Sequence, residues 1–243
     1  MERNTCYLNL SVAEAARTVS ELVERAGLSS RMVDCHELRQ GENLCGMVLL
    51  FEKYFLRMGS RLTLTAVLDN LEGRTRLYWT VTGGAGMLRQ SGDSKTAAEE
   101  YSEVGLIVCL QLGEHTFLNA VLLSGRLKAG GKKMEDSYFV ALGLRECGET
   151  IHAAVTDSIT GELVDHYELT HPGGGTCVVA VYEKHYYRAG NRLTLTVVLD
   201  DFTGRTRVHC IGGGGGEGLF RFDWGAAESF EGVVHDALSH YRL

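Results

Sequence analysis

The sequence predicts an α+β protein built from two tandem repeats, each a two-layer unit in which helices cover one face of an antiparallel sheet. Three observations predict this fold class: a long phrase that occurs twice, a fixed order of strand and helix periodicity in each copy, and strands in which apolar and polar residues alternate. In each repeat we expect a strand, a helix, a five-stranded antiparallel meander and a final helix. We further expect a pseudo-two-fold axis to relate the repeats.

The duplication is visible without gaps in the alignment. "EKYFLRMGSRLTLTAVLDNLEGRTR" begins at residue 52 and "EKHYYRAGNRLTLTVVLDDFTGRTR" at residue 183, which is 183 − 52 = 131 positions later, and 16 of the 25 positions are identical. The match extends upstream, where Tyr7 aligns with Tyr138. Downstream, Gly105 aligns with Gly218 at a spacing of 113, so the first copy carries an insertion of 131 − 113 = 18 residues, at about 86–104. We therefore predict a first unit over 1–127, a Gly- and Lys-containing linker over 128–137 and a second unit over 138–243.

The helices follow from apolar residues at helical spacing. In the first copy a short strand, "YLNLS", precedes a run of apolar residues that recur with helical period from Val12 to Ala26. Ser11 and Glu14 have the spacing of a capping box, and Gly27 is placed to end the helix. The final helix of each repeat is predicted around Phe117 and Val121 in the first copy, and around Phe230, Val234, Ala237 and Leu238 in the second.

Five strands are predicted between the helices of the first repeat, at 31–39, 46–57, 61–70, 74–82 and 105–112. The segments "RMGS" and "NLEG" contain the glycines that tight hairpins need. Along 61–69 the apolar side chains of Leu62, Leu64, Ala66 and Leu68 alternate with polar ones, and 192–200 repeats the pattern. We expect the apolar face of each sheet to pack under the helices and the polar face to remain in solvent.

This order of elements, duplicated in tandem, is similar in topology to TATA-box-binding proteins and to the wider group of helix-grip folds. The phrase "E-K-x-x-x-R-x-G-x-R-L-T-L-T" also resembles a family of small, uncharacterised bacterial proteins, mostly from Firmicutes, that usually carry one copy. That resemblance covers nearly all of both repeats. It implies no catalytic residues, because the family has no assigned function.

Composition limits the function classes. A chain of 243 residues with 44% hydrophobic and 23% charged residues is typical of globular proteins, and we expect a cytoplasmic location, because the N-terminal residues are polar and no apolar run is long enough to span a bilayer. The net charge of −7 argues against nucleic acid as a partner, since phosphate binding needs clustered Lys and Arg. Seven cysteines without a CxxC pair argue against a disulfide framework or a structural zinc site, and we expect most of them to be reduced and buried.

The candidate site is the polar face of the sheets. If the hairpins are short, Glu52, Thr65 and Tyr78 form one cross-strand row, with Arg76 nearby. In the second copy the corresponding residues are Glu183, Thr196 and His209, with Arg207 nearby. Such a row suits a polar small molecule or a peptide, although a solvated face with no ligand explains the same pattern. The pairs Asp69 with Arg74 and Asp200 with Arg205 are expected to flank turns.

Other motifs are weaker. The run "IGGGGGEG" at 211–218 and "TGGAG" at 82–86 resemble phosphate loops, but we expect a strand rather than a helix to follow them, so a bulge or strand connection is favoured. The segments "CHE" at 35–37 and "HYELTH" at 166–171 lack the HExxH spacing of zinc proteases. Neither Cys109 with His115 nor Cys210 with His209 has the third group that a cysteine nucleophile needs. We therefore assign no catalytic residue, no metal ligand and no cofactor.

The leading hypothesis is a binding or interaction module without evident catalysis, acting through the polar sheet face on an unknown small molecule or protein, with no membrane association. The two repeats would form a pseudo-dimer within one chain, so the protein would not need a second copy and would be stable as a monomer. The alternative is a small-ligand-binding protein or enzyme of helix-grip type with an internal pocket. Nucleic-acid binding through the sheet ranks third.

Overall fold

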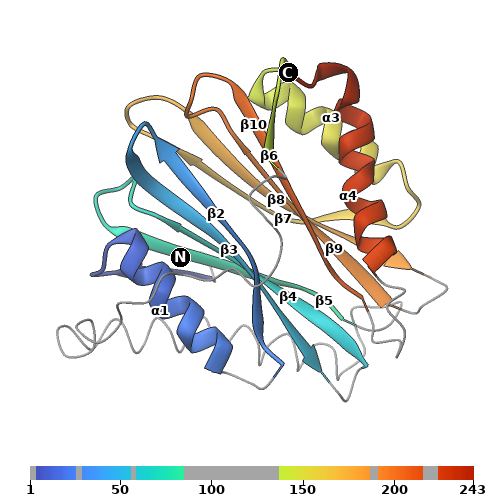
Figure 1. Cartoon of the computed structure of the whole chain (residues 1–243), viewed down its shortest axis with the longest axis horizontal. Helices are drawn as coiled ribbons and strands as arrows, with labels where there is room; N and C mark the ends of the chain where they lie inside the picture. The colour runs from blue at the N-terminus through green and yellow to red at the C-terminus, as the bar shows by residue number, and fades with distance from the viewer. Residues whose placement is uncertain (1–3, 26–28, 56–58, 85–136, 187–190, 216–223) are drawn as a thin grey trace. The chain divides into compact units, whose positions relative to one another are not determined.

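A computed structural model describes residues 4–25, 29–55, 59–84, 137–186, 191–215 and 224–243 (Figure 1). The chain divides into two compact units, and each is described by itself. The described residues of one unit are 4–25, 29–53 and 64–81, and those of the other are 54–55, 59–63, 82–84, 137–186, 191–215 and 224–243. The domain bounds expected from the sequence stay a prediction.

The described residues of the first repeat form one five-stranded antiparallel sheet and a helix. Its elements are β1 (Thr5–Leu8), α1 (Val12–Arg25), β2 (Arg31–Gln40), β3 (Asn43–Phe55), β4 (Ser60–Asp69) and β5 (Thr75–Gly83). The strand order is β1-β5-β4-β3-β2, so the strand that precedes the helix returns to pair with the last strand of the meander.

The second repeat has the same order of elements. They are β6 (Ser137–Val140), α3 (Leu144–Thr156), β7 (Gly161–Thr170), β8 (Thr176–Tyr186), β9 (Asn191–Asp200), β10 (Thr206–Gly214) and α4 (Trp224–Leu238), followed by the 3-10 turn η2 (Ser239–Tyr241). Its strand order, β6-β10-β9-β8-β7, repeats that of the first sheet. The predicted α+β class and the duplicated halves are confirmed.

The predicted five-stranded meander needs a correction. In the described part of the chain each sheet has five strands, of which four belong to the meander and the fifth is the strand before the helix. The strand expected at 105–112 lies outside the described residues, as do the helix around Phe117 and the 86–104 insertion. In the second copy, Trp224 and Gly225 fall in the segment aligned with that strand, and both are helical.

The capping box predicted for α1 is present. The Ser11 N–H donates to Oε2 of Glu14 at 3.0 Å, and the Glu14 N–H donates to Oγ of Ser11 at 3.3 Å. Six residues on one face of α1 are buried: Val12, Ala15, Ala16, Val19, Ser20 and Val23. The expected stop at Gly27 lies outside the described residues.

The helices of the second repeat cover the apolar face of its sheet, as expected, and Figure 1 shows α3 and α4 side by side on that face. Leu193, Leu195, Val197 and Leu199 of β9 form one core cluster with Cys147, Ile151 and Val155 of α3 and Phe230, Val234 and Leu238 of α4. Burial of these side chains supplies the main free energy that holds α3 and α4 to the sheet.

The opposite face of the strands is buried as well, which corrects the expectation of a solvated face. Thr194 and Thr196 are each 1% exposed, and Thr65 of the first repeat has the same value. Part of the cover comes from the same compact unit, where Oγ1 of Thr63 lies 3.0 Å from Oγ1 of Thr194. The neighbouring strands also place Val181 and Ile211 beside Thr196, so this face is mixed rather than polar.

Candidate functional site

The predicted cross-strand row does not form in the second repeat. Glu183 stands opposite Thr194, Thr196 stands between Val181 and Ile211, and His209 stands opposite Val198. The three predicted residues therefore share one face but lie in three different rows. Each hairpin pairs two residues away from the register that the short-turn assumption gave, and a shift by two preserves the face while it breaks the row.

The two predicted glutamates are already engaged by arginines. Glu183 accepts a hydrogen bond from Nη1 of Arg192 at 2.9 Å, and the same nitrogen lies 3.1 Å from Oε1 of Glu162. In the first repeat, Nη2 of Arg31 donates to Oε2 of Glu52 at 2.9 Å. Both predicted carboxylates are almost fully buried, so these ion pairs offset the cost of removing their charges from water.

The predicted arginines pair across strands. Nε of Arg76 lies 3.0 Å from Oδ2 of Asp69, and Nε of Arg207 lies 2.8 Å from Oδ2 of Asp200. The prediction that Asp69 pairs with Arg74 and Asp200 with Arg205 was therefore wrong, because the actual partner lies two residues further along each strand. The reason is the register, which places Arg207 directly opposite Asp200 on the neighbouring strand.

The remaining predicted residues are enclosed to different degrees. His209 is buried, and its Nδ1 lies 2.9 Å from Oγ of Ser137 on β6. Thr65 is buried, and Tyr78 is half-buried. Whether any of the eight predicted side chains binds a ligand stays a prediction.

The glycine runs are explained by close backbone packing. Gly83 and Gly214, at equivalent positions of the two repeats, have positive φ angles of 94° and 81°. A Cβ atom would lie 2.8 Å from the Arg61 carbonyl oxygen at Gly83 and 2.7 Å from that of Arg192 at Gly214. Gly212, Gly213 and Gly214 belong to β10, and residues 216–218 lie outside the described residues. The next described element is the helix α4, so the strand expected after the run is wrong at residues 224 and 225.

Among the described residues five cysteines are free, and four of these are buried: Cys45, Cys147, Cys177 and Cys210. Cys6 is disulfide-bonded, an exception to the expectation that most cysteines are reduced. Within the described ranges, no group of three His, Cys, Asp or Glu side chains is arranged to hold a metal ion. Cys109 and His115 lie outside those ranges.

The second repeat contains a pocket of about 550 Å³ between α3 and strands β7, β8 and β9, which we call the α3 pocket. Its floor consists of buried apolar side chains from the helix and the sheet. They include Ile151 of α3, Ala180 of β8, and Val197 and Leu199 of β9. A volume of this size falls within the range of small-molecule sites.

The rim of the α3 pocket is polar and comes from two elements. Arg145, Glu149 and His152 extend from α3, and His166 and Glu168 extend from β7; all five are exposed. In the described part of the chain, no hydrogen bond or ion pair engages the side chains of Arg145, Glu149 or Glu168. The predicted glutamates on the other face are, in contrast, paired with arginines.

Gly148 opens the middle of the pocket wall. It lies within α3, where glycine costs roughly 1 kcal/mol relative to alanine. A Cβ atom at this position would make an ordinary contact of 3.6 Å with Cδ1 of Leu199. The position thus tolerates a small side chain, and a large one would enter the pocket.

Tyr182 at the base of the pocket remains neutral over the physiological range. Burial, with a smaller contribution from Cys210, raises the pKa of its hydroxyl to about 12. Its ring lies 6.1 Å from the His152 ring between centroids, at an interplanar angle of 40°. The pocket therefore offers an aromatic surface and a neutral hydroxyl rather than a charged base.

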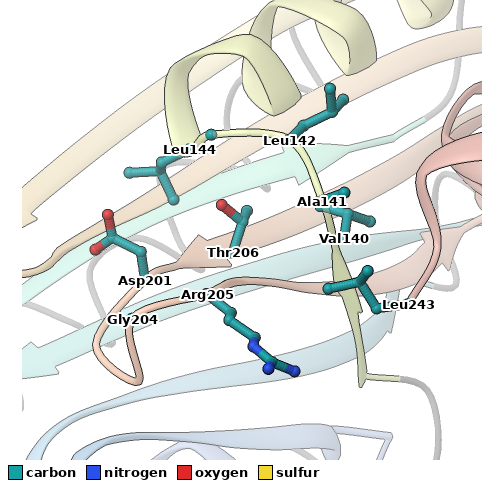
Figure 2. A pocket seen from close by; sticks show the side chains of 10 residues that line it. Val140, Ala141, Leu142, Leu144, Asp201, Gly204, Arg205, Thr206 and Leu243 are labelled. Atoms are coloured by element: carbon teal, nitrogen blue, oxygen red, sulfur yellow. The ribbon is translucent and has the colours of Figure 1, made fainter.

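A second hollow of about 510 Å³ lies at the beginning of α3, between the end of β6 and the β9–β10 hairpin (Figure 2). Asp201 at its edge already accepts the Thr176 N–H at 2.6 Å. Figure 2 shows the Arg205 side chain pointing away from Asp201 and Thr206. The polar groups of this hollow therefore do not point to one place.

The sequence contained a signal for the α3 pocket that the prediction did not use. "HYELTH" places His166 and Glu168 two residues apart on one strand, hence on one face, and a glycine lies inside the apolar stretch that forms α3. Recognising the pocket also requires the register of β7 against β8, which sets His166 opposite Ala180.

A known family model matches part of the chain. The model of a family described as "Family of unknown function (DUF6054)" matches residues 140–242, within the second repeat. The chain matches none of the curated proteins. The expected bacterial origin and the topological likeness to TATA-box-binding proteins stay predictions.

Among solved structures, the chain is similar to the di-domain ARO/CYC StfQ from the steffimycin biosynthetic pathway. The sequence identity is 8%, the alignment covers 97% of each chain, and the TM-score is 0.26. A similarity at this score has no bearing on the activity of the present protein. In the part of the chain that the structure describes, no helix has both the length and the apolar character needed to cross a membrane.

Proposed function

We propose that the protein binds a small, partly apolar molecule in the α3 pocket, with no catalytic step assigned. The observation that carries this proposal is a hollow of about 550 Å³ that combines a buried apolar floor with a rim whose charged side chains have no partner among the described residues. Most small-molecule sites have this combination, in which apolar surface supplies affinity and a few polar groups set orientation.

The polar sheet face supports a binding function less well. Its glutamates are buried and paired with arginines, so a ligand would have to break existing ion pairs before it gained new ones. The α3 pocket makes no such demand, because Glu149 and Glu168 are exposed at its rim.

A fluorescence titration with the neutral apolar dye N-phenyl-1-naphthylamine tests the proposal. The wild-type protein should bind the dye with enhanced emission, and Gly148→Trp should weaken binding at least tenfold because the indole occupies the pocket. Gly148→Ala is the matched control and should bind like wild type, since its methyl group makes only an ordinary contact with Leu199.

Ala180→Leu is a second way to fill the pocket, from the sheet rather than the helix. Circular dichroism and thermal unfolding establish that each variant is folded before its affinity is compared. Dye binding that is absent in the wild type, or unchanged in folded Gly148→Trp and Ala180→Leu, would refute a binding function for the pocket.

A further inference from the structure

We propose that the ligand of the α3 pocket carries a positively charged head group, an amine or a guanidine, on an apolar body. This inference rests on the proposed function, and it names the class of molecule that the same pocket accepts. It follows from where the apolar and the charged side chains lie relative to one another.

The apolar body is specified by the floor. Ile151, Val197 and Leu199 are 1–3% exposed, and Ala180 is 7% exposed. Here the main gain on binding comes from removing ligand carbon atoms from water. A fully polar ligand would lose its hydration against this floor without regaining hydrogen bonds.

The sign of the head group is specified by the rim. Glu149 on α3 and Glu168 on β7 present carboxylates from two walls, and Arg145 is the one positive charge among the described residues that line the pocket. Counted over the carboxylates and the guanidinium, the formal rim charge is two negative groups against one positive group, or −1. A cationic head group therefore meets net attraction.

An anionic head group is the competing possibility, because Arg145 lies in the first turn of α3. Glu149 follows it by four residues on the same side of the helix, and Glu168 lies on the facing strand. A carboxylate that approached Arg145 would thus also meet two like charges. We expect charge to favour an amine over a carboxylate on the order of tenfold at low ionic strength.

Octylamine, octanol and octanoate provide a direct test, because they share one chain length and differ in head-group charge. Each is titrated against bound N-phenyl-1-naphthylamine in low salt at pH 7.5. Octylamine should displace the dye at about one tenth of the octanoate concentration, with octanol between them. The preference should shrink as salt is raised.

The double variant Glu149→Gln/Glu168→Gln should bring the amine and carboxylate affinities to within about twofold, with each competitor measured against the dye affinity of that same variant. Glu146→Gln is the matched control, because Glu146 lies on the same helix but does not line the pocket, and it should keep the full preference.

The outcomes separate the two proposals. Dye binding that Gly148→Trp abolishes, with octanoate equal to or better than octylamine, would overturn the cationic head group and leave the binding function in place. An amine preference that survives in Glu149→Gln/Glu168→Gln would also overturn the inference of a cationic head group. If the wild type binds no dye, the binding function fails and this inference fails with it.

Discussion

Arg207 on β10 stands directly opposite Asp200 on β9, and its Nε lies 2.8 Å from Oδ2 of the aspartate. The same relationship joins Arg76 to Asp69 in the first repeat at 3.0 Å. Both aspartates are 0% exposed. The duplication has therefore kept a cross-strand ion pair, with its carboxylate buried, at equivalent positions of both sheets.

Removing the arginine should leave a buried carboxylate without its main counter-charge. We expect Arg207→Ala to lower the free energy of unfolding by about 3 kcal/mol, measured by urea denaturation. The double variant Arg207→Ala/Asp200→Asn should recover part of this loss, because the unpaired charge is gone. A loss below about 0.5 kcal/mol in the single variant would mean that the pair contributes no more than a surface ion pair.

Gly148→Ala should stabilise the protein. Alanine has the higher helix propensity, and its methyl group fits beside Leu199 at 3.6 Å, so we expect a gain of about 0.5–1 kcal/mol in unfolding free energy. Gly161→Ala is the contrasting variant, since its Cβ would lie 2.1 Å from the Val155 carbonyl oxygen, and it should destabilise. Equal effects at the two glycines would contradict the difference in free space around them.

Tyr138→Phe should preserve or increase stability. The Tyr138 hydroxyl is buried and has no hydrogen-bond partner among the described residues, and burial raises its pKa. Removing the hydroxyl relieves a desolvation cost of about 1 kcal/mol. Its ring remains to hold the Arg242 guanidinium, whose Cζ lies 4.3 Å from the ring centroid.

Tyr138→Leu is the control for that variant, because it removes both the hydroxyl and the ring. Thermal unfolding should rank Tyr138→Phe at or above wild type and Tyr138→Leu below it. A marked loss in Tyr138→Phe would show that the hydroxyl makes a stabilising hydrogen bond.

The free thiols of Cys35 and Cys147 should react slowly in the folded protein. Burial raises the pKa of both thiols to about 12, and at Cys35 the neighbouring Glu37 and Asp34 carboxylates add to the effect. Both thiols stay protonated at pH 8, so iodoacetamide labelling followed by mass spectrometry should find them modified only after denaturation. Cys35 is partly exposed, so iodoacetamide can reach it. Rapid labelling of Cys35 in the folded protein would therefore contradict the raised pKa of its thiol.

The same shifts predict how stability varies at alkaline pH. In the unfolded chain these thiols ionise near pH 9, whereas in the folded protein they keep their protons to about pH 12. The folded state therefore binds more protons over this window, and the unfolding free energy should fall as pH rises from 9 toward 12. Cys147→Ala should flatten the slope in urea titrations at pH 8, 9 and 10.

Ser11→Ala should destabilise α1 by about 1 kcal/mol through loss of the capping box. Hydrogen bonds from the side chain and backbone of Ser11 lower the pKa of Glu14, so this contribution is present at neutral pH and is lost as pH falls through the folded pKa. The stability difference between wild type and variant should therefore shrink at pH 3. Thr18→Ala, which removes a hydroxyl bonded to the Glu14 carbonyl, is the control and should show no such pH dependence.

Local signals in the sequence predicted the elements well. The Ser11–Glu14 spacing located the start of α1, and the alternation along β9 identified the residues that pack under the helices. These features depend on neighbours a few residues apart, which a single sequence contains. The duplication strengthened each prediction, because it had to hold in both copies.

The site was harder to predict because it depends on pairing between distant segments. His209 and Thr196 share a face, but only the β9–β10 register shows that they occupy different rows. The apolar neighbours of Thr196, which are Val181 and Ile211, likewise come from two other strands. The α3 pocket depends on the separation between α3 and the edge strand β7, and no local sequence pattern specifies that separation.

The first repeat has different residues at two positions that align with the α3 pocket of the second repeat. Gly148 aligns with residue 148 − 131 = 17, which is Arg17, and Ala180 aligns with 180 − 131 = 49, which is Leu49. The twin copies have thus diverged in bulk at two positions that set the free space under a helix. If a ligand binds in the second copy alone, selection would restrict side-chain size at Gly148 and Ala180 but not at Arg17 and Leu49.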